Sequence, residues 1–388
     1  MKKQLLIILM ILVTTMLYGA GNQETSIGVT NETITIGTTL GMSGRSAVFG
    51  LSAKKGMDIY IEYINRQGGV NGRKLELIAM DDAFNPSNTA SAIRRLVERD
   101  RVFAIVGSAG QFSVSAITNY LNNNEIPLVF PLSTGVHNQP PLEWIFPYQP
   151  HIGIEAPIMA QELLDRGKER VGIIFPNTDN GQTAYSKAKG QLGQYLVEAV
   201  RVDADIHDFS NAILRLKNAG VDSVMIYILT PQIESFVKQT SEFGLEVTFF
   251  TTMTNVNHRT IERLGSLAEG LLGITYVPAD FSEPEGNIRH IYTKITGDKE
   301  QPNGFVVIGM MAMDLFVLAL ENIEGEITRK SLKTSLENLQ DKQGLMVENI
   351  GFSEFDKKNP NTRTGVSSMN ILQVNQGEWT SYYGDSRR

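Results

Sequence analysis

The chain of 388 residues contains no cysteine, only two tryptophans and only five histidines. Without cysteine there are no disulfides, no thiol nucleophiles and no thiolate metal ligands. The histidines are scattered and form no H-E-x-x-H or comparable zinc pattern. The sequence also lacks a G-x-S-x-G elbow, a Walker A loop and a well-placed G-x-G-x-x-G. We therefore predict no catalytic site, no metal site and no cofactor.

The chain also lacks an excess of basic residues. It carries 35 Lys and Arg against 42 Asp and Glu, for a formal net charge of −7. A nucleic-acid partner would require a basic face, so none is expected. No internal repeat of 20–50 residues is visible, which disfavours a solenoid. The length exceeds that of one ordinary domain and predicts two lobes.

The amino terminus has the pattern of an export signal. Lys2 and Lys3 precede the apolar run Leu5–Leu17, and small residues follow at positions 19–21. This run is shorter than the about 20 residues that cross a bilayer, although a retained anchor is the alternative. We predict a cleaved signal peptide over residues 1–20 and a periplasmic protein that is not lipidated, because the chain has no cysteine to lipidate. We find no second long apolar run and predict no transmembrane helix.

Strand-like and helix-like segments alternate from residue 33 onward. The strands are short, continuous apolar runs, which is typical of parallel strands covered by helices on both faces. The predicted strands of this first series are Thr33–Thr39, Leu75–Met80, Phe103–Gly107 and Pro127–Pro131. The predicted helices between them are Ala47–Gln67, Asn85–Arg99 and Gln111–Asn123. This order predicts an α/β lobe with a doubly wound sheet.

Three prolines between residues 141 and 150 interrupt the pattern, and a second series follows. Its predicted strands are Val171–Phe175, Glu198–Ile206, Ser223–Leu229, Val247–Thr251 and Leu271–Val277. Helices at Phe305–Ile323 and Thr328–Leu339 come next, then strand-like segments at Gly351–Asp356 and Met369–Val374. We predict one lobe from residues 33–149 plus 277–349, and a second from 150–276 plus 350–384.

Several short motifs occur in a recognisable order. They include Met42-Ser43-Gly44, the stretch INRQGGVNGRKL at residues 64–75, and Asp81-Asp82 ahead of Asn85. Together they make the chain resemble the type I periplasmic substrate-binding proteins of ABC transporters, in the Leu/Ile/Val-binding branch, over residues 33–376. The resemblance implies two Rossmann-like lobes that hinge around a cleft, a small-molecule ligand in that cleft, and membrane permease subunits as partners.

The resemblance also implies ligand-binding positions in the first lobe. Two loops would hold the ligand's carboxylate with hydroxyls and backbone amides, one with Ser108 and Gln111, the other with Ser133 and Thr134. Gln111 stands where a serine is common. Phe49 matches the aromatic wall beside the ligand's side chain. For Ser133 and Thr134, ordinary turn capping is the alternative.

In the second lobe the matching positions depart from the family pattern. Asn180 and Leu229 stand where aromatic residues are frequent, and Met253 stands near the acidic residue that pairs with an α-ammonium. A buried ammonium without a countercharge costs several kcal/mol. Either another acid replaces the missing one or the ligand is not a standard α-amino acid. Asp179 is the nearest candidate, but it could equally cap the helix that it precedes.

The sequence therefore predicts an exported binding protein that delivers a small carboxylate, such as a branched-chain or other amino acid, to an ABC transporter. The alternative is a module that senses an aromatic or short-chain carboxylic acid through a receptor. An exported α/β hydrolase is a third possibility. Asp81 and Asp82, which resemble an acid–base or metal pair, are interpreted as stabilising the loop to Asn85.

Overall fold

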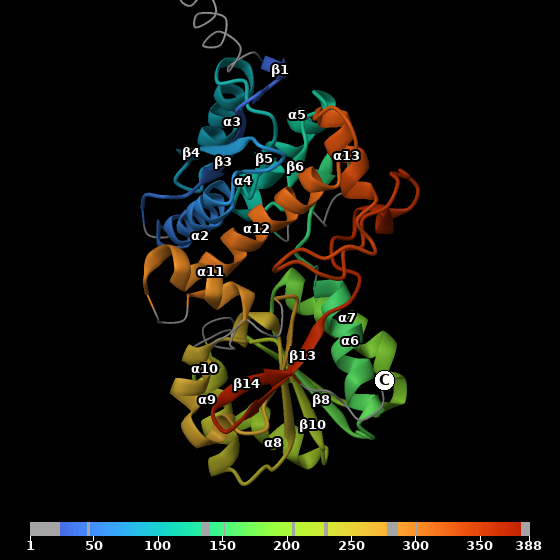
Figure 1. Ribbon diagram of the computed structural model, residues 1–388. Coiled ribbons are helices and arrows are strands. Elements are labelled where there is room, and N and C mark those ends of the chain that lie inside the picture. The colour runs from blue at the N-terminus through green and yellow to red at the C-terminus, as the bar shows by residue number, and fades with distance from the viewer. Residues whose placement is uncertain are drawn as a thin grey trace, which may run out of the picture. The chain divides into compact units, whose positions relative to one another are not determined.

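The computed structural model describes residues 24–44, 47–133, 140–150, 152–203, 206–228, 232–277, 286–298 and 302–381. The chain divides into two compact units (Figure 1). Unit 1 contains the chain up to Gln149 and His290–Ser367, and unit 2 contains Pro150–Arg289 and the chain from Ser368 onward. The predicted signal peptide lies outside the described residues.

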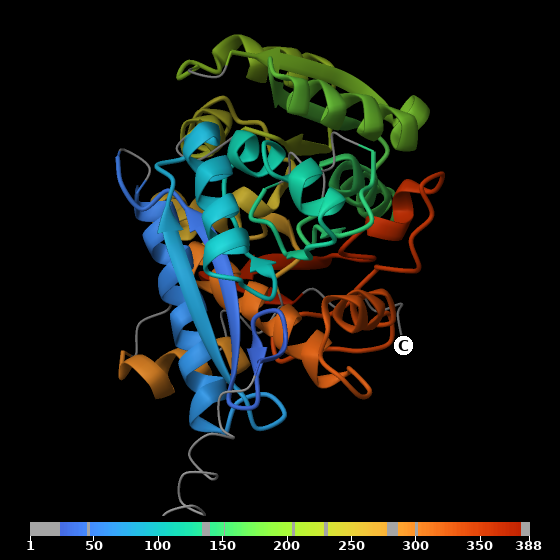
Figure 2. The same cartoon turned by 90° about the horizontal axis from the view of Figure 1, so that it is seen from above.

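The sheet of unit 1 has seven strands, and its parallel part follows the order β4-β3-β5-β6-β7. Two short strands, β1 and β2, add antiparallel pairing beside β3. The bounds are β1 Glu24–Ser26, β2 Val29–Thr30, β3 Thr33–Leu40, β4 Lys74–Asp81, β5 Ile105–Val106, β6 Leu128–Val129 and β7 Ile145–Phe146. β3 and β4 run side by side along α2, which spans Ala47–Arg66 (Figure 2).

Helices connect these strands in the predicted places, with one difference. The expected helix 111–123 consists of two short helices, because the chain turns at Ala116 and Ile117. The helices of unit 1 are α2, α3 Pro86–Arg94 with a π-turn at Arg95–Arg99, α4 Gln111–Ser115, α5 Thr118–Asn123, α12 Gly304–Glu321, α13 Arg329–Glu337 and the 3₁₀ turn Pro360–Arg363. α11, Asn287–Thr296, spans the boundary between the two units.

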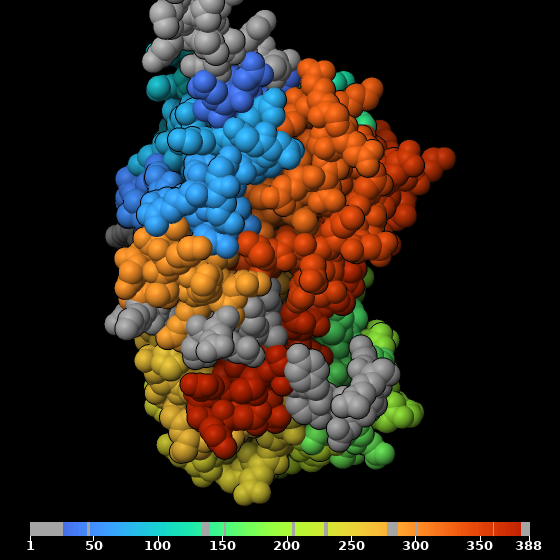
Figure 3. Space-filling view, in the orientation of Figure 1, coloured from blue at the N-terminus to red at the C-terminus, as the bar shows by residue number. Residues whose placement is uncertain are grey.

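Unit 2 repeats the same parallel strand order, here β9-β8-β10-β11-β12, and adds the antiparallel strands β13 and β14. Its strands are β8 Val171–Pro176, β9 Leu196–Val202, β10 Ser223–Ile226, β11 Thr248–Thr251, β12 Leu272–Thr275, β13 Asn370–Asn375 and β14 Glu378–Ser381. Its helices are α6 Ile152–Asp165, α7 Asp179–Leu192, α8 Ser210–Asn218, α9 Gln232–Glu242 and α10 His258–Leu264, with 3₁₀ turns at Gly193–Tyr195, Met253–Asn255 (η4) and Gly265–Ala268. The hairpin β13–β14 reaches the surface of unit 2 in Figure 3 (dark red).

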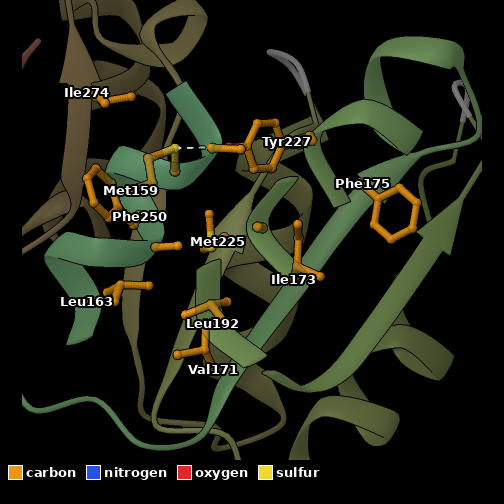
Figure 4. Packing of buried hydrophobic residues seen from close by; sticks show 14 of the residues in the cluster. Met159, Leu163, Val171, Ile173, Phe175, Leu192, Met225, Tyr227, Phe250 and Ile274 are labelled. Atoms are coloured by element: carbon orange, nitrogen blue, oxygen red, sulfur yellow. Dashed lines mark hydrogen bonds between the residues drawn. The ribbon is translucent and has the colours of Figure 1, made fainter. Parts of the chain in front are cut away.

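The core of unit 2 lies between the sheet and the helix pair α6 and α7. Met159 and Leu163 of α6 pack against Ile173 and Met225 of the strands, and all four side chains are fully buried (Figure 4). The hydroxyl of Tyr227, just after β10, donates to the sulfur of Met159 at 3.3 Å. α6 is thereby attached to the carboxyl edge of the sheet.

In unit 1, glycines let helices α2 and α12 approach each other closely. A Cβ atom at Gly56 would lie 1.9 Å from the carbonyl oxygen of Val306, and one at Gly309 would lie 2.1 Å from that of Ala53. Any side chain at either position would therefore force the helices apart.

α12 is the second long apolar run, which the sequence analysis did not find. It is the single helix in the described part of the chain that is long and apolar enough to cross a membrane, and 78% of it is buried inside unit 1. Apart from the terminal Glu321, the acidic residue in this helix is Asp314, which is buried. Its carboxylate accepts hydrogen bonds from the hydroxyl of Tyr60 and from the backbone amides of residues 345–347. This pattern identifies α12 as a core helix.

The segment 350–367 differs from its prediction. The expected strand Gly351–Asp356 is absent, and the segment packs onto unit 1, so the boundary falls after Ser367 and not after residue 349. The cause is Arg363, which is buried, pairs with Glu337 at 2.6 Å and lies 4.5 Å from the ring centre of Phe146. Phe352 adds an edge-to-face contact with the same ring. The other predicted exchange point, at residue 277, lies at 289/290 in the structure.

Candidate functional site

Both units have the strand order 2-1-3-4-5 of doubly wound sheets. In such sheets ligands bind beyond the carboxyl ends of the strands, at the point where successive connections diverge to opposite faces. That point lies between β3 and β5 in unit 1 and between β8 and β10 in unit 2. A ligand site is therefore expected at the carboxyl edge of each sheet.

In unit 1 the structure brings together the two loops that the sequence assigned to a carboxylate. The loops after β5 and β6 continue the parallel pairing through an isolated bridge between Ala109 and Leu132. The amide of Leu132 donates to the carbonyl of Ser108 at 2.8 Å, and the amide of Gly110 donates to the carbonyl of Leu132 at 3.2 Å. These backbone bonds hold the two loops side by side.

The side chains of these loops differ in accessibility. Ser108 is fully buried, and its hydroxyl accepts hydrogen bonds from both the amide and the hydroxyl of Thr39 at 3.1 Å. Ser133 is 5% exposed, whereas Gln111 lies exposed at the start of α4. Thr134 lies outside the described residues. Among Ser108, Gln111 and Ser133, Gln111 is thus the one with an exposed side chain.

The loop that follows β4 lies at the same carboxyl edge and has a strained backbone. Ala83 and Phe84 adopt positive φ angles of 50° and 54°, a region that non-glycine residues rarely occupy. Asp82 holds this turn, because its carboxylate accepts from the amide of Phe84 at 2.9 Å and from the hydroxyl of Thr89 at 2.7 Å. The interpretation of Asp81 and Asp82 as loop-stabilising residues is confirmed. The ring of Phe84 then lies so close to Gly41 that a Cβ atom there would be 2.1 Å from it.

Phe49 lies in the first turn of α2 and is 41% exposed. It packs edge-to-face against Phe305 in the first turn of α12, with ring centres 4.5 Å apart. Phe305 is 43% exposed, so the pair presents an aromatic surface to the outside of unit 1. The sequence predicted Phe49 alone, because only the packing of α2 on α12 brings its partner beside it.

In unit 2 the loop after β8 leads into α7. Thr178 is the N-cap of this helix and accepts from the amide of Gly181 at 3.2 Å, so Asp179 does not cap it. Asp179 and Asn180 occupy the first turn and are exposed. Leu229 lies outside the described residues.

Met253 opens the turn η4, directly after β11. Buried Asn255 fixes this turn by donating to the carbonyl of Ile228 at 2.9 Å and to the hydroxyl of Thr251 at 2.8 Å. The half-buried side chain of Met253 therefore has a defined position at the carboxyl edge of the sheet.

The residue that sequence reasoning missed is Glu155, in the first turn of α6. It is 5% exposed, and its Oε1 atom accepts from the amide of Met253 at 3.0 Å. Burial raises the pKa of this carboxyl to about 7, although the bond from Met253 acts in the opposite direction. Its negative charge in turn contributes to the raised pKa of Tyr227, for which burial is the larger cause. The signal in the sequence was a single acid in the otherwise apolar first nine residues of α6.

Two surface hollows lie elsewhere. One of about 420 Å³ is lined by the carboxyl-terminal half of α2 and by Lys74 and Leu77 of β4, and one of about 530 Å³ by residues around the amino ends of β11 and β12. Neither touches the carboxyl edges, and their walls are largely charged or polar. Within the described ranges, no three acidic or histidine side chains are placed to hold a metal ion.

Comparisons with known proteins agree with this architecture. The family model described as periplasmic binding protein matches residues 33–378. The chain is 30% identical over 196 residues to the Leu/Ile/Val-binding protein homolog 3 of Brucella melitensis, covering 49% of this chain and 53% of that protein. It is 23% identical over 355 residues to the leucine-, isoleucine-, valine-, threonine-, and alanine-binding protein of Pseudomonas aeruginosa, covering 88% and 94%.

Among solved structures, an ABC transporter substrate-binding protein from Sphaerobacter thermophilus matches with a TM-score of 0.73 at 22% identity, covering 91% of this chain and 97% of that one. The predicted type I binding-protein fold is confirmed by this match and by the two sheets. The family model covers most of the chain, and its members bind ligands and are not enzymes, as the sequence predicted. The chain therefore belongs to the periplasmic binding protein family.

Proposed function

We propose that the protein is the exported solute-binding component of an ABC transporter. It captures a small carboxylate-bearing ligand, a branched-chain or other amino acid, between its two units and delivers it to the permease subunits. Closure of the units about the three chain crossings would accompany capture. A cleaved, unlipidated leader over residues 1–20 belongs to the same proposal.

The observation that carries this proposal is the pair of loops after β5 and β6. They are joined by backbone bonds at the carboxyl edge of the sheet, the edge at which doubly wound sheets bind ligands, beside the switch point between β3 and β5. The exposed side-chain amide of Gln111 is a donor suited to an anionic carboxylate, and no acidic side chain is among the residues that join the loops. The aromatic surface of Phe49 and Phe305 supports an apolar side chain on the ligand. The binding specificities named for the relatives support an aliphatic amino acid.

The proposal is tested by ligand-induced stabilisation. The purified protein is melted with each of the twenty amino acids and with short-chain and aromatic carboxylic acids. A ligand that binds only the folded state at about 100 times its dissociation constant raises the free energy of unfolding by about 2.7 kcal/mol. We expect leucine, isoleucine or valine to raise the melting temperature. Small-angle scattering with that ligand should show compaction.

The variant Phe49→Ala should weaken binding of the confirmed ligand, because it removes half of the aromatic pair. Leu214→Ala is the matched control, since Leu214 is 44% exposed on α8 of unit 2 and is not one of the predicted binding residues. If no amino acid or carboxylic acid shifts the melting temperature at millimolar concentration, the proposed function is wrong. A shift by aromatic acids alone would favour the sensing module.

A further inference from the structure

We propose that Glu155 is the ligand-binding carboxylate of unit 2 and that it pairs with a cationic ligand group, the α-ammonium of an amino acid. The inference rests on the proposed function and specifies it, because a plain carboxylic acid has no group for Glu155 to bind. Three observations carry it: the burial of the side chain, its place in the fold, and the lack of a cationic partner for it among the described residues.

Burial is the first observation. Glu155 is 5% exposed, and the hydrogen bond from the amide of Met253 to Oε1 is the one bond that its carboxylate makes among the described residues. A carboxylate can accept about four hydrogen bonds, so most of its capacity remains unused. Removing such a group from water is costly unless it is paired, and unpaired buried carboxyls with perturbed pKa values concentrate at functional sites.

Position in the fold is the second observation. α6 leads directly into the amino end of β8, so the first turn of this helix lies at the opposite, carboxyl edge of the sheet. The contact with Met253 confirms this placement, because Met253 follows the carboxyl end of β11. Tyr227, whose pKa is raised partly by Glu155, follows β10 at the same edge. Glu155 thus lies at the carboxyl edge of the sheet, the edge at which doubly wound sheets bind their ligands.

Charge is the third observation. None of the described lysine, arginine and histidine side chains forms an ion pair with Glu155. Among the described residues, Tyr227 is the titratable neighbour that interacts with it, and burial keeps that phenol neutral at ordinary pH. The methionines that flank the group, Met159 and Met253, are uncharged. A ligand ammonium would supply the missing positive charge.

Asp179 is less suited to this role. It lies exposed in the first turn of α7, where water solvates its charge and a ligand gains little by pairing with it. The acid expected near Met253 is missing from the loop after β11. The carboxylate that lies beside Met253 belongs to Glu155 of α6. An acid from α6 therefore replaces one from the loop after β11.

Ligand binding should then be linked to proton release. In the free protein the carboxyl of Glu155, with a pKa of about 7, is close to half protonated at neutral pH. An ammonium beside it lowers this pKa, so binding displaces the proton from the carboxyl to the buffer. Affinity for an amino acid should increase as the pH rises from 5 to 8, and this dependence should be absent for the deaminated analogue.

The deciding experiment compares leucine with its deaminated analogue, 4-methylpentanoate, by calorimetry on the wild type, Glu155→Gln and Asp179→Asn. Glutamine keeps the Oε1 acceptor for the amide of Met253 and removes only the charge. We expect Glu155→Gln to lose about 10- to 100-fold in leucine affinity and to bind 4-methylpentanoate no more weakly than the wild type does. Asp179→Asn should leave leucine affinity unchanged.

Unchanged leucine affinity in Glu155→Gln would overturn the assignment while leaving the proposed function intact. An equal loss for both ligands would also overturn it, by showing a purely structural role. If the wild type binds carboxylic acids but no amino acid, the assignment of Glu155 is overturned, and if it binds neither, the proposed function itself fails. Should Glu155→Gln not fold, leucine titrations of the wild type at pH 7 in two buffers of different ionisation enthalpy decide the matter. We expect about half a proton to be released, and no release would overturn the inference.

Discussion

Asp314 in unit 1 and Glu155 in unit 2 are both carboxylates removed from water, but their surroundings differ. Asp314 accepts from four donors, the hydroxyl of Tyr60 and three consecutive backbone amides at 345–347. Glu155 accepts from the amide of Met253 alone among the described residues. Burial raises the pKa of both, and for Asp314 the four donors act in the opposite direction.

The difference separates two uses of a buried acid. The donors around Asp314 tie the segment 345–347 to helices α12 and α2, so this carboxylate stabilises the core of unit 1. Glu155 ties one turn to one helix and keeps most of its hydrogen-bonding capacity unused. A buried acid that makes few hydrogen bonds and has no cationic partner among the described residues is a candidate ligand-binding residue. Substitutions at these two carboxylates and at the helix contacts of each unit test this contrast.

Asp314→Ala should destabilise the protein most. The substitution leaves a phenol and three amides of unit 1 without their acceptor, and we expect a loss of roughly 3–5 kcal/mol in the free energy of unfolding. Urea denaturation followed by circular dichroism measures it. Asp341→Ala is the control, because Asp341 is exposed and loses no comparable bond. Similar midpoints for the two variants would contradict the structural role of Asp314.

Glu155→Gln should have the opposite effect on stability at alkaline pH. In the folded protein the pKa of Glu155 is about 7, whereas the ordinary pKa of a glutamate, which applies to the unfolded chain, is 4.5. Between these values the folded state binds more protons than the unfolded state, so this group lowers stability as the pH rises. The difference between the two pKa values corresponds to roughly 3 kcal/mol in the free energy of unfolding.

As the pH rises from 4.5 to 8, the free energy of unfolding of the ligand-free wild type should therefore fall by up to roughly 3 kcal/mol relative to that of Glu155→Gln. Denaturant unfolding of both proteins at pH 5 and pH 8 measures the difference, and other titrating groups cancel in the comparison. A stability difference that stays constant across this pH range would mean that Glu155 is not buried as a nearly neutral acid.

Gly56→Ala in unit 1 and Gly190→Ala in unit 2 compare a helix glycine at a close helix contact with one that faces open space. A Cβ atom at Gly56 collides with the backbone of α12, so we expect a loss of about 1–3 kcal/mol. In unit 2, Gly190 lies in α7 with no atom within 4 Å of an added Cβ. Gly190→Ala should instead stabilise by about 0.5–1 kcal/mol, through helix propensity. Thermal melting of both variants gives the signs, and equal signs would refute the close crossing of α2 and α12.

Much of the fold was predictable, because parallel strands covered on both faces are continuous apolar runs that alternate with helices. The errors share a cause. The helix expected at 111–123 divides where the chain turns at Ala116 and Ile117, and 351–356 is irregular because Arg363 anchors its neighbourhood to Phe146 and Glu337. α12 was recognised as a helix but not as a long apolar run. Local patterns contain no information about such distant partners.

The candidate site divides in the same way. Loops that follow strands could be located from the chain alone, and Ser108, Gln111 and Ser133 lie on the two loops that the sheet brings side by side. Whether these residues bind a ligand stays a prediction. Phe305 could not be found as a partner of Phe49, because 256 positions separate them and only the crossing of α2 and α12 joins them.

The order of residue types along the chain was sufficient to indicate the family, the alternation of strands and helices, and the positions of the loops that follow the strands. The tertiary structure alone decided which carboxylate occupies the edge of unit 2. Glu155 and Met253 are 98 positions apart, and no periodicity relates an acid at the start of one helix to a turn after a distant strand. The pKa of that acid is likewise a property of the packed fold, because burial, and not residue type, removes its carboxyl from water.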